Sequence, residues 1–422
     1  MYIINSSVEM DLVRLQGYIA EHRVANVRYQ KLKNIYEGAH DILKRKAKGE
    51  NKPDNRIVVN FAKYIVDISE GFFISIPIKM FHPDSLVSEY LVYLNKYNDL
   101  DDRVAELSKL CAIYGNGFEM VYIDEMGQTG VTYINPMEAF VVYDDSIVCR
   151  PKYGVRYFKN TDGVVEGSYS DAKFIYYFTE LDDGTLVYSK EPQPHIFGAP
   201  PLTEYVANEE RLGAFEGVIS EINAYNNAIS EKANDVDYFA DAYIVTKGMD
   251  FGDKSSLFRD GRHIELLGRD VKDLDVFFLE KPNADTTQEN LINRLSNLIF
   301  AMSMVMNIND PNFGTQSGIA IKYKLTAMEN LAKIKERKFI AGFNRRFKMV
   351  ANTGLTPLKG DEWMNIEFTF TRNYPANLLE ESEIAKNLDG VVSKETALSV
   401  LSVVKNPKEE VQRIEAEGGT VV

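Results

Sequence analysis

Residues 209–241 read EERLGAFEGVISEINAYNNAISEKANDVDYFAD, and this stretch decides the fold. Eight of its positions follow one another at alternating spacings of three and four residues, which predicts a long helix with one packing face. These positions are Leu212, Phe215, Ile219, Ile222, Asn226, Ile229, Ala233 and Val236. The stretch holds eight acidic residues against Arg211 and Lys232. We therefore expect a helix of about 30 residues, roughly 45 Å long and strongly negative.

The segment that follows predicts a small insertion and a returning helix. Tyr243–Thr246, Ile264–Leu267 and Asp275–Leu279 read as short strands separated by glycines. An insertion of about 40 residues is too small to fold alone. Thr287–Asn307 reads as a second helix with one apolar stripe, and we expect it to return antiparallel to the first.

A third long helix, expected at Ile319–Val350, is the most basic part of the chain. It holds nine lysines or arginines against Glu329 and Glu336, a net charge of +7. Because the whole chain has a net charge of −14, the remainder carries −21. Beyond this helix, the alternating residues Asn365–Thr371 predict a strand, and the residues from Pro375 onward are acidic and helical.

The first 200 residues predict an α+β domain. Helices are expected at Val8–Glu37, Ile57–Phe73 and Leu86–Tyr114. Strands are expected at Phe118–Ile123, Val131–Ile134, Ala139–Tyr143, Lys152–Phe158, Phe174–Thr179 and Thr185–Lys190. The basic, polar stretch His40–Arg56 would form an exposed loop, and the proline-rich stretch Pro192–Pro201 would mark a domain boundary.

Composition narrows the class of protein. The chain has 422 residues, 45% of them hydrophobic, which is enough for two or three domains with sizeable cores. Its negative charge argues against a protein that holds nucleic acid by neutralising phosphates. The most apolar region, Ile57–Phe81, is too interrupted by charge for a membrane span, and we expect neither a membrane role nor a secretion signal. Cys111 and Cys149 are expected to be buried free thiols.

Catalytic spacings are missing from the sequence. It contains no phosphate-binding loop, no HExxH, no GxSxG and no GxGxxG, so we predict no catalytic residue, cofactor or metal ligand. The five histidines lie far apart and are expected at the surface or as caps. Acidic pairs can hold metal ions for nuclease chemistry, but here each pair falls at a predicted turn or helix start, where aspartate caps amides. The pairs are Asp101-Asp102, Asp144-Asp145 and Asp182-Asp183.

Four stretches in a fixed order resemble the portal proteins of tailed phages with long non-contractile tails. The first is Lys52–Phe61, KPDNRIVVNF, followed by Tyr64–Asp67, and the second is Gly115-Asn116-Gly117. The third runs from Asn312-Phe313-Gly314 through Ser317–Tyr323. The fourth is Val392–Thr396, which precedes Asn406-Pro407. Each stretch is weak alone, but their order covers most of the chain.

The resemblance implies an α+β, portal-type ring subunit with a wing, a stem, a clip and a crown. The wing would comprise residues 1–208, and the two stem helices residues 209–241 and 287–308. The clip would be residues 242–286, which form a small α/β unit. Residues 309–318 would form a tunnel loop, residues 319–375 the basic helix and a strand returning to the wing, and residues 376–422 a helical crown.

The resemblance also implies three sets of site residues. The tunnel loop that projects toward DNA would comprise Asn309, Asp310, Asn312, Phe313, Gly314, Thr315, Gln316 and Ser317. The acidic residues that line the channel would be Glu216, Glu221, Glu231 and Asp235. A basic set would face either a neighbouring subunit, which we favour, or phosphates; it comprises Lys333, Lys335, Arg337, Lys338, Arg345 and Arg346.

As function, the resemblance implies a non-enzymatic channel at the capsid vertex for packaging and ejecting DNA. Expected partners are about eleven further copies of the chain in a closed ring, double-stranded DNA, a separate terminase ATPase, a head-tail adaptor, and the major capsid and scaffolding proteins. The chain would reside in the virion, and in the host cytoplasm during assembly. The rival interpretations are a metal-dependent DNA-processing enzyme and a coiled-coil scaffold or adaptor.

Overall fold

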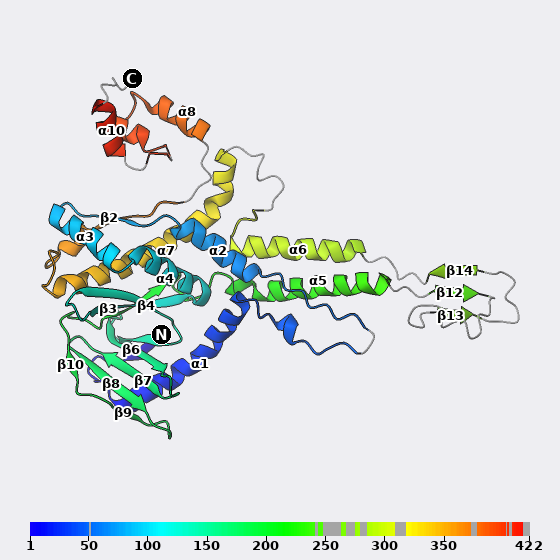
Figure 1. Ribbon diagram of the computed structural model, residues 1–422, viewed down its shortest axis with the longest axis horizontal. Coiled ribbons are helices and arrows are strands. Elements are labelled where there is room, and N and C mark those ends of the chain that lie inside the picture. Colours follow the sequence, from blue (N-terminus) through cyan, green and yellow to red (C-terminus); the bar gives the residue numbers. More distant parts are fainter. Residues whose placement is uncertain are drawn as a thin grey trace.

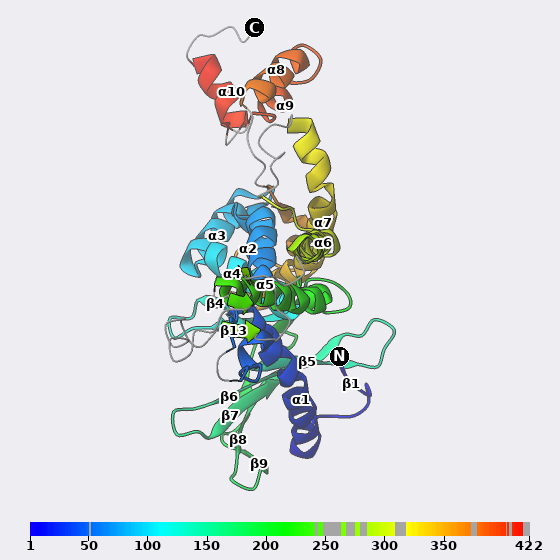
Figure 2. The ribbon, with the colours of Figure 1, turned by 90° about the vertical axis from the view of Figure 1, so that its right-hand side faces the viewer.

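The computed structural model describes residues 1–49, 52–240, 244–247, 263–266, 275–278, 285–308, 318–372, 378–401, 403–404 and 407–416. Figure 1 shows a body of sheets and helices from which two long helices, α5 (Ile219–Ala240) and α6 (Asp285–Ser303), project side by side. A small sheet lies beyond their far ends. The C-terminal helices lie apart from the body, as Figure 2 also shows. The α+β prediction is confirmed.

The body contains one large sheet and two small ones. The large sheet has the order β1-β5-β6-β7-β8-β10, with β9 paired to β8. Its strands are β1 (Tyr2–Ile4), β5 (Ala139–Asp144), β6 (Pro151–Lys159), β7 (Val165–Ser170), β8 (Phe174–Glu180), β9 (Leu186–Tyr188) and β10 (Gln193–Pro194). The first small sheet has the order β11 (Leu202–Val206), β3 (Asn116–Ile123) and β4 (Thr129–Ile134). The second pairs β15 (Glu367–Thr369) with β2 (Lys79–Phe81).

Four helices of the N-terminal half and one long later helix cover these sheets. They are α1 (Leu12–Tyr36), α2 (Phe61–Ile74), α3 (Ser85–Tyr97), α4 (Leu100–Tyr114) and α7 (Gly318–Asn352). One core cluster joins Leu91 of α3 and Leu107 of α4 to Phe339 and Phe343 of α7. The body is therefore held together by residues more than 200 positions apart in the sequence.

The sequence prediction of one helix over Leu86–Tyr114 is wrong, because α3 and α4 are separate. Asp99 has a left-handed backbone, with φ of 47°, which ends the helical run. The buried side chain of Asn98 donates to the carbonyl oxygen of Thr129 at 3.0 Å and accepts from the amide of Val131 at 2.8 Å. The break thus ties the helices to β4.

The motif Gly115-Asn116-Gly117 makes the transition from α4 to β3. Gly115 has a φ of +91°, and a Cβ atom there would lie 2.0 Å from the carbonyl oxygen of Arg211. Only glycine fits such a close backbone approach in a left-handed conformation. The motif therefore fixes the point at which the chain segment before α5 crosses α4.

The later elements follow the sequence prediction closely. The small distal sheet has β12 (Ile244–Lys247) between β13 (His263–Leu266) and β14 (Asp275–Phe278). The C-terminal helices are α8 (Leu378–Leu388), α9 (Lys394–Leu398) and α10 (Pro407–Ala416). Short 3₁₀ turns lie at Asp41–Lys44, Glu216–Val218 and Glu362–Asn365. Among the described helices, none has the length and apolarity needed to cross a membrane.

Three of the five histidines are buried, which corrects the expectation of surface positions. His22, His40 and His82 are each less than 5% exposed. The ring of His22 lies 2.7 Å from the hydroxyl of Tyr157 and 2.8 Å from the carbonyl oxygen of Pro136. Burial lowers the pKa of His22 to about 4, so the ring is neutral at pH 7. Cys111 is buried as expected, whereas Cys149 is only half-buried.

Candidate functional site

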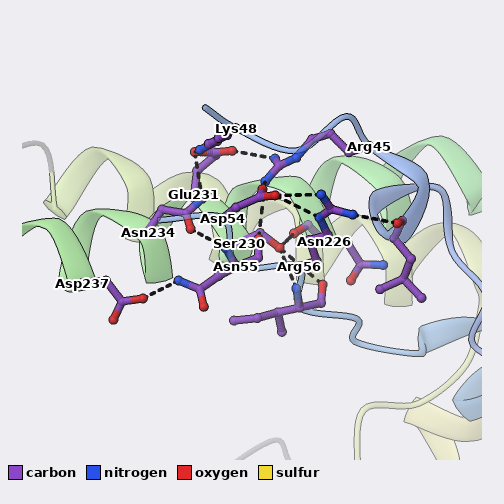
Figure 3. A network of polar contacts seen from close by, with 12 residues as sticks. Arg45, Lys48, Asp54, Asn55, Arg56, Asn226, Ser230, Glu231, Asn234 and Asp237 are labelled. Carbon is purple, nitrogen blue, oxygen red and sulfur yellow. Dashed lines mark hydrogen bonds and ion pairs between the residues drawn. The ribbon is translucent and has the colours of Figure 1, made fainter. Parts of the chain in front are cut away.

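Residues 40–49 and 52–60, from the segment between α1 and α2, lie along α5, and we call them the strap. Three polar side chains of α5 accept hydrogen bonds from alternate backbone amides of the strap (Figure 3). Asn226 Oδ1 accepts from Val59 N at 2.9 Å, and Ser230 Oγ accepts from Ile57 N at 2.9 Å. Asn234 Oδ1 accepts from Asn55 N at 2.6 Å. We call this set of three bonds the amide ladder.

The amide ladder can form because every fourth residue of α5 and every second residue of the strap have nearly the same spacing. Four residues of an α-helix advance about 6 Å, and two residues of an extended chain advance about 6.6 Å. The side chains of Asn226, Ser230 and Asn234 therefore have nearly the same spacing as every second amide of the strap, which runs antiparallel to α5. All three side chains are at most 5% exposed, so the amides that they satisfy have little access to water.

Ion pairs reinforce the strap near the end of the ladder that contains Asn234 (Figure 3). Glu231 of α5 pairs with Arg45, at 2.6 Å, and with Lys48. Within the strap, Asp54 lies 2.7 Å from Arg56 and 2.9 Å from Arg45. Hydrogen bonds from Arg56 and then Arg45 lower the pKa of Asp54 to about 2. The stretch His40–Arg56 is a loop with many exposed residues, as expected, but the sequence did not predict that this loop is bound to α5.

The opposite side of α5 packs against α6. Asp235 accepts a hydrogen bond from Gln288 at 2.7 Å, and Lys232 pairs with Glu289. At 100° per residue, the residues of α5 that bind α6 fall nearly opposite those that bind the strap. The antiparallel return of α6 is confirmed, and α5 is held between the strap on one side and α6 on the other.

The four acidic residues expected to line a channel have varied surroundings. Glu216 precedes α5 and binds Arg28, whose Nε donates at 2.7 Å. Glu231 binds the strap, and Asp235 faces α6. Glu221 accepts from Ser220 at 2.8 Å and makes no ion pair within the described part of the chain. Glu216, Glu231 and Asp235 thus bind other segments of the chain, whereas Glu221 accepts from its neighbour on α5.

Two residues of the basic set are buried, and the expectation that they face a neighbour or phosphates is wrong. Arg346 is 1% exposed and donates to Glu119, with Nε at 2.8 Å; the same carboxylate accepts from the hydroxyl of Tyr205 at 3.1 Å. Lys335 is 8% exposed and lies 2.5 Å from Glu70. These cations bind the inner face of α7 to α2 and β3.

The other four residues of the basic set lie nearer the surface. Arg345 donates to the carbonyl oxygen of Pro200 at 2.9 Å, and burial lowers its pKa. Lys338 pairs with Glu209. Lys333 and Arg337 are exposed, with Lys333 lying 3.5 Å from Glu329. Only these last two keep the open placement that contact with another molecule requires.

The tunnel-loop residues Asn309 to Ser317 lie outside the described residues, and so does most of the expected clip. The structure does describe how the chain approaches the loop. The hydroxyl of Tyr64 donates to the carbonyl oxygen of Met306 at 3.0 Å and accepts from the amide of Ile308 at 3.0 Å. Tyr64 belongs to the first stretch that resembles portal proteins. It therefore anchors the residues that precede the expected loop to α2.

The acidic pairs engage mainly in local hydrogen bonds. Asp144 accepts from the amide of Arg150 at 2.8 Å, and Asp183 accepts from the amide of Thr185 at 2.9 Å. Asp145 instead accepts from the amide of Ser6 at 2.8 Å, which ties the N-terminus to the end of β5. Within the described ranges, no three carboxylate, histidine or cysteine side chains converge as metal ligands do.

The residues that hold α5 were not predicted from the sequence. Asn226 was counted as part of an apolar stripe, and Ser230 and Asn234 were not singled out. The available signal was polar residues repeating every four positions through the middle of a helix that otherwise reads as a packing helix. Such a row predicts a polar partner that lies along the helix.

An α+β body, a projecting antiparallel helix pair with a small distal sheet, and a set of short C-terminal helices define a portal-type subunit. Comparison with known proteins agrees. The chain belongs to the family described as phage portal protein, SPP1 Gp6-like, whose family model matches residues 16–421. Membership makes it a phage portal protein and a structural component of the phage particle.

Two curated relatives, each named Portal protein, align over nearly the whole chain. The protein of Bacillus phage SPP1 is 24% identical over 445 residues, which cover 97% of this chain and 87% of the relative. The protein of Clostridium phage phiCD119 is 20% identical over 417 residues, which cover 91% of each chain.

Two solved structures resemble the chain at 12% identity. A chain from the virion of a native gene transfer agent particle has a TM-score of 0.44, with 80% of this chain and 88% of that chain covered. A chain from the neck of an empty particle of the same kind has a TM-score of 0.39, with 80% and 89% covered.

Proposed function

We propose that the chain forms a ring of about twelve copies at the capsid vertex, and that its axial channel passes double-stranded DNA during packaging and ejection. One observation carries the proposal: α5 and α6 project from the body as an antiparallel pair, and α5 is fixed by the strap and by α6. A ring of such pairs would form a channel wall. Since α5 has four carboxylates against Lys232, the wall would not hold phosphates tightly.

The segments take their roles from this assignment. Residues 1–208 act as the wing, residues 209–241 and 287–308 as the stem, and residues 242–286 as the clip. Residues 309–318 act as the tunnel loop near DNA, residues 319–375 supply the basic helix and returning strand, and residues 376–422 form the crown. Within the stem, Glu221 is the acidic residue best placed to repel phosphates, because its charge is not paired with a cation in the described structure.

The subunit performs no chemistry of its own in this proposal and needs no cofactor. A separate terminase supplies the energy for packaging, and a head-tail adaptor attaches at the clip. The major capsid and scaffolding proteins surround the ring at the vertex. The protein is made in the host cytoplasm and remains in the virion.

Deletion of the chain from its phage tests the proposed function. We expect heads that contain no DNA, and supply of the chain from a plasmid should restore packaged heads. Packaged, DNA-filled heads in the absence of the chain would refute the proposal. A divalent-metal cleavage assay with the purified chain separates the channel role from the rival DNA-processing enzyme, because a channel subunit leaves the DNA uncut.

A further inference from the structure

One side of α7 carries a basic row that points away from the core. Leu325, Met328, Phe339 and Phe343 face the core, and the positions nearly opposite them on the helix form a row at spacings of three and four. This row, the outer stripe, comprises Asn330, Lys333, Arg337, Ala341, Asn344 and Lys348. Five of the six residues are exposed and Asn344 is half-buried. The outer stripe carries a charge of +3.

The cations of the outer stripe are largely unused within the chain. Arg337 makes no ion pair within the part of the chain that the structure describes. Lys348 lies over the ring of Trp363, with Nζ 5.8 Å from the ring centroid. Lys333 lies 3.5 Å from Glu329 on its own helix, a half-buried carboxylate that also pairs with Arg372. By contrast, the inward cations Lys335 and Arg346 are fully engaged. The outer stripe is thus a separate charged surface.

A surface of opposite charge lies where α3 meets α4. We call it the acidic corner; its exposed charged residues are Glu89, Lys96, Asp99, Asp101 and Asp102. Four carboxylates against one lysine give a net charge of −3, equal and opposite to that of the outer stripe. Large hydrophobic side chains are exposed beside these charges, among them Val92 at 54% and Tyr93 at 44%. An exposed apolar pair rimmed by charge is typical of a contact surface.

The outer stripe and the acidic corner cannot meet within one chain. Figure 2, which looks toward the ends of α5 and α6, places α3 on one side of α2 and the first, yellow half of α7 on the other. The core cluster that contains Leu91 of α3 and Phe343 of α7 lies between them. Two unlike, complementary surfaces on opposite sides of a subunit are what a head-to-tail ring contact requires.

We propose that the outer stripe of α7 binds the acidic corner of the next copy of this chain around the ring. The inference rests on the proposed ring function and names the surfaces that close it. Lys333, Arg337 and Lys348 would meet the carboxylates of the corner, and the small Ala341 at the middle of the stripe would let Val92 and Tyr93 approach the helix. The partner is therefore a second copy.

Charge reversal of each surface, alone and in combination, tests the proposal. One variant carries Lys333→Glu, Arg337→Glu and Lys348→Glu, and the other carries Glu89→Lys, Asp101→Lys and Asp102→Lys. Each variant turns three exposed attractions across the contact into repulsions. The protein concentration at which half of the chains are assembled into rings should therefore be roughly a hundredfold higher than for the wild type. The chain with all six substitutions, and an equimolar mixture of the two variants, should form rings again, because each outer stripe then faces a corner of opposite charge.

The control is a variant with the same change of charge elsewhere, Lys159→Glu, Lys173→Glu and Lys190→Glu. These lysines are exposed on or beside strands β6, β8 and β9 of the large sheet, and their reversal should leave assembly unchanged. Unaltered circular dichroism and thermal unfolding of the variants would show that they fold. Ring assembly by both single-surface variants at wild-type concentration, or failure of both combinations to restore it, would overturn the inference while leaving the ring in place. Failure of the wild-type chain itself to form rings would instead refute the proposed function.

Discussion

Removal of the amide ladder should release the strap from α5 without unfolding the chain. Replacement of Ser230 by alanine leaves the amide of Ile57 without an acceptor, and the triple change Asn226→Ala, Ser230→Ala and Asn234→Ala removes all three acceptors. A hydrogen bond of this kind contributes about 1 kcal/mol net, so the triple variant should lose roughly 3 kcal/mol of the free energy that holds the strap. That loss corresponds to roughly a hundredfold faster local opening.

Amide hydrogen exchange of the peptide that covers residues 52–60 measures this opening directly. The melting temperature is a poorer readout, because alanine also raises the helix propensity of α5 by up to about 0.7 kcal/mol per residue. Asn227→Ala is the matched control: it makes the same change on an exposed residue of α5 that lies beside the ladder. Equal exchange of the strap amides in the wild type and the triple variant, or equal acceleration by Asn227→Ala, would refute the ladder.

Three further predictions address charge and burial. Glu231→Gln should lower the free energy that holds the strap on α5 by about 0.5–1 kcal/mol at low salt and have little effect near 1 M salt, because Arg45 and Lys48 are partly exposed and salt screens their attraction to Glu231. The same exchange experiment measures this change. Arg346→Met should cost about 3–5 kcal/mol in urea unfolding, since it strands the buried Glu119; Glu119→Gln in the same chain should recover part of that loss. The fold lowers the pKa of His22 from 6.5 to about 4. Below pH 6.5 the unfolded chain therefore binds a proton at His22 that the folded chain does not, and the free energy of unfolding should fall by up to about 3 kcal/mol as the pH drops toward 4. His22→Gln should flatten that part of the stability profile, and an unchanged slope would contradict the assignment.

Helical periodicity located all three long helices, because apolar residues every three or four positions are typical of a helix that packs on one face. The first was expected to begin at residue 209 and to have about 30 residues, and this length is wrong: α5 has 22 residues, Ile219–Ala240, and follows a 3₁₀ turn at Glu216–Val218. The third helix was expected at Ile319–Val350 and is observed at Gly318–Asn352. The three strands of the distal sheet lie within two residues of their predicted bounds. Turn signals between alternating runs likewise located most strands of the body. The strands that were missed are short or polar, such as β1 and β7.

Contacts between distant segments limited the rest of the prediction. The strap was predicted as an exposed loop because its charge is visible in the sequence, whereas its acceptors on α5 lie more than 160 residues away. In the same way, the burial of Arg346 depends on Glu119, which is 227 residues earlier. A net charge of +7 on one helix does not reveal which cations point inward. The tunnel-loop assignment stays a prediction, because its residues lie outside the described structure.

The mass of the purified chain in solution tests most directly whether the chain closes into a ring around a channel. One chain has a mass of 47.9 kDa, so a ring of about twelve copies should sediment as a particle of about 575 kDa. Electron microscopy of that particle should show end-on views with a central hole. A monomer or dimer that persists at high protein concentration and across a range of salt would contradict the claim.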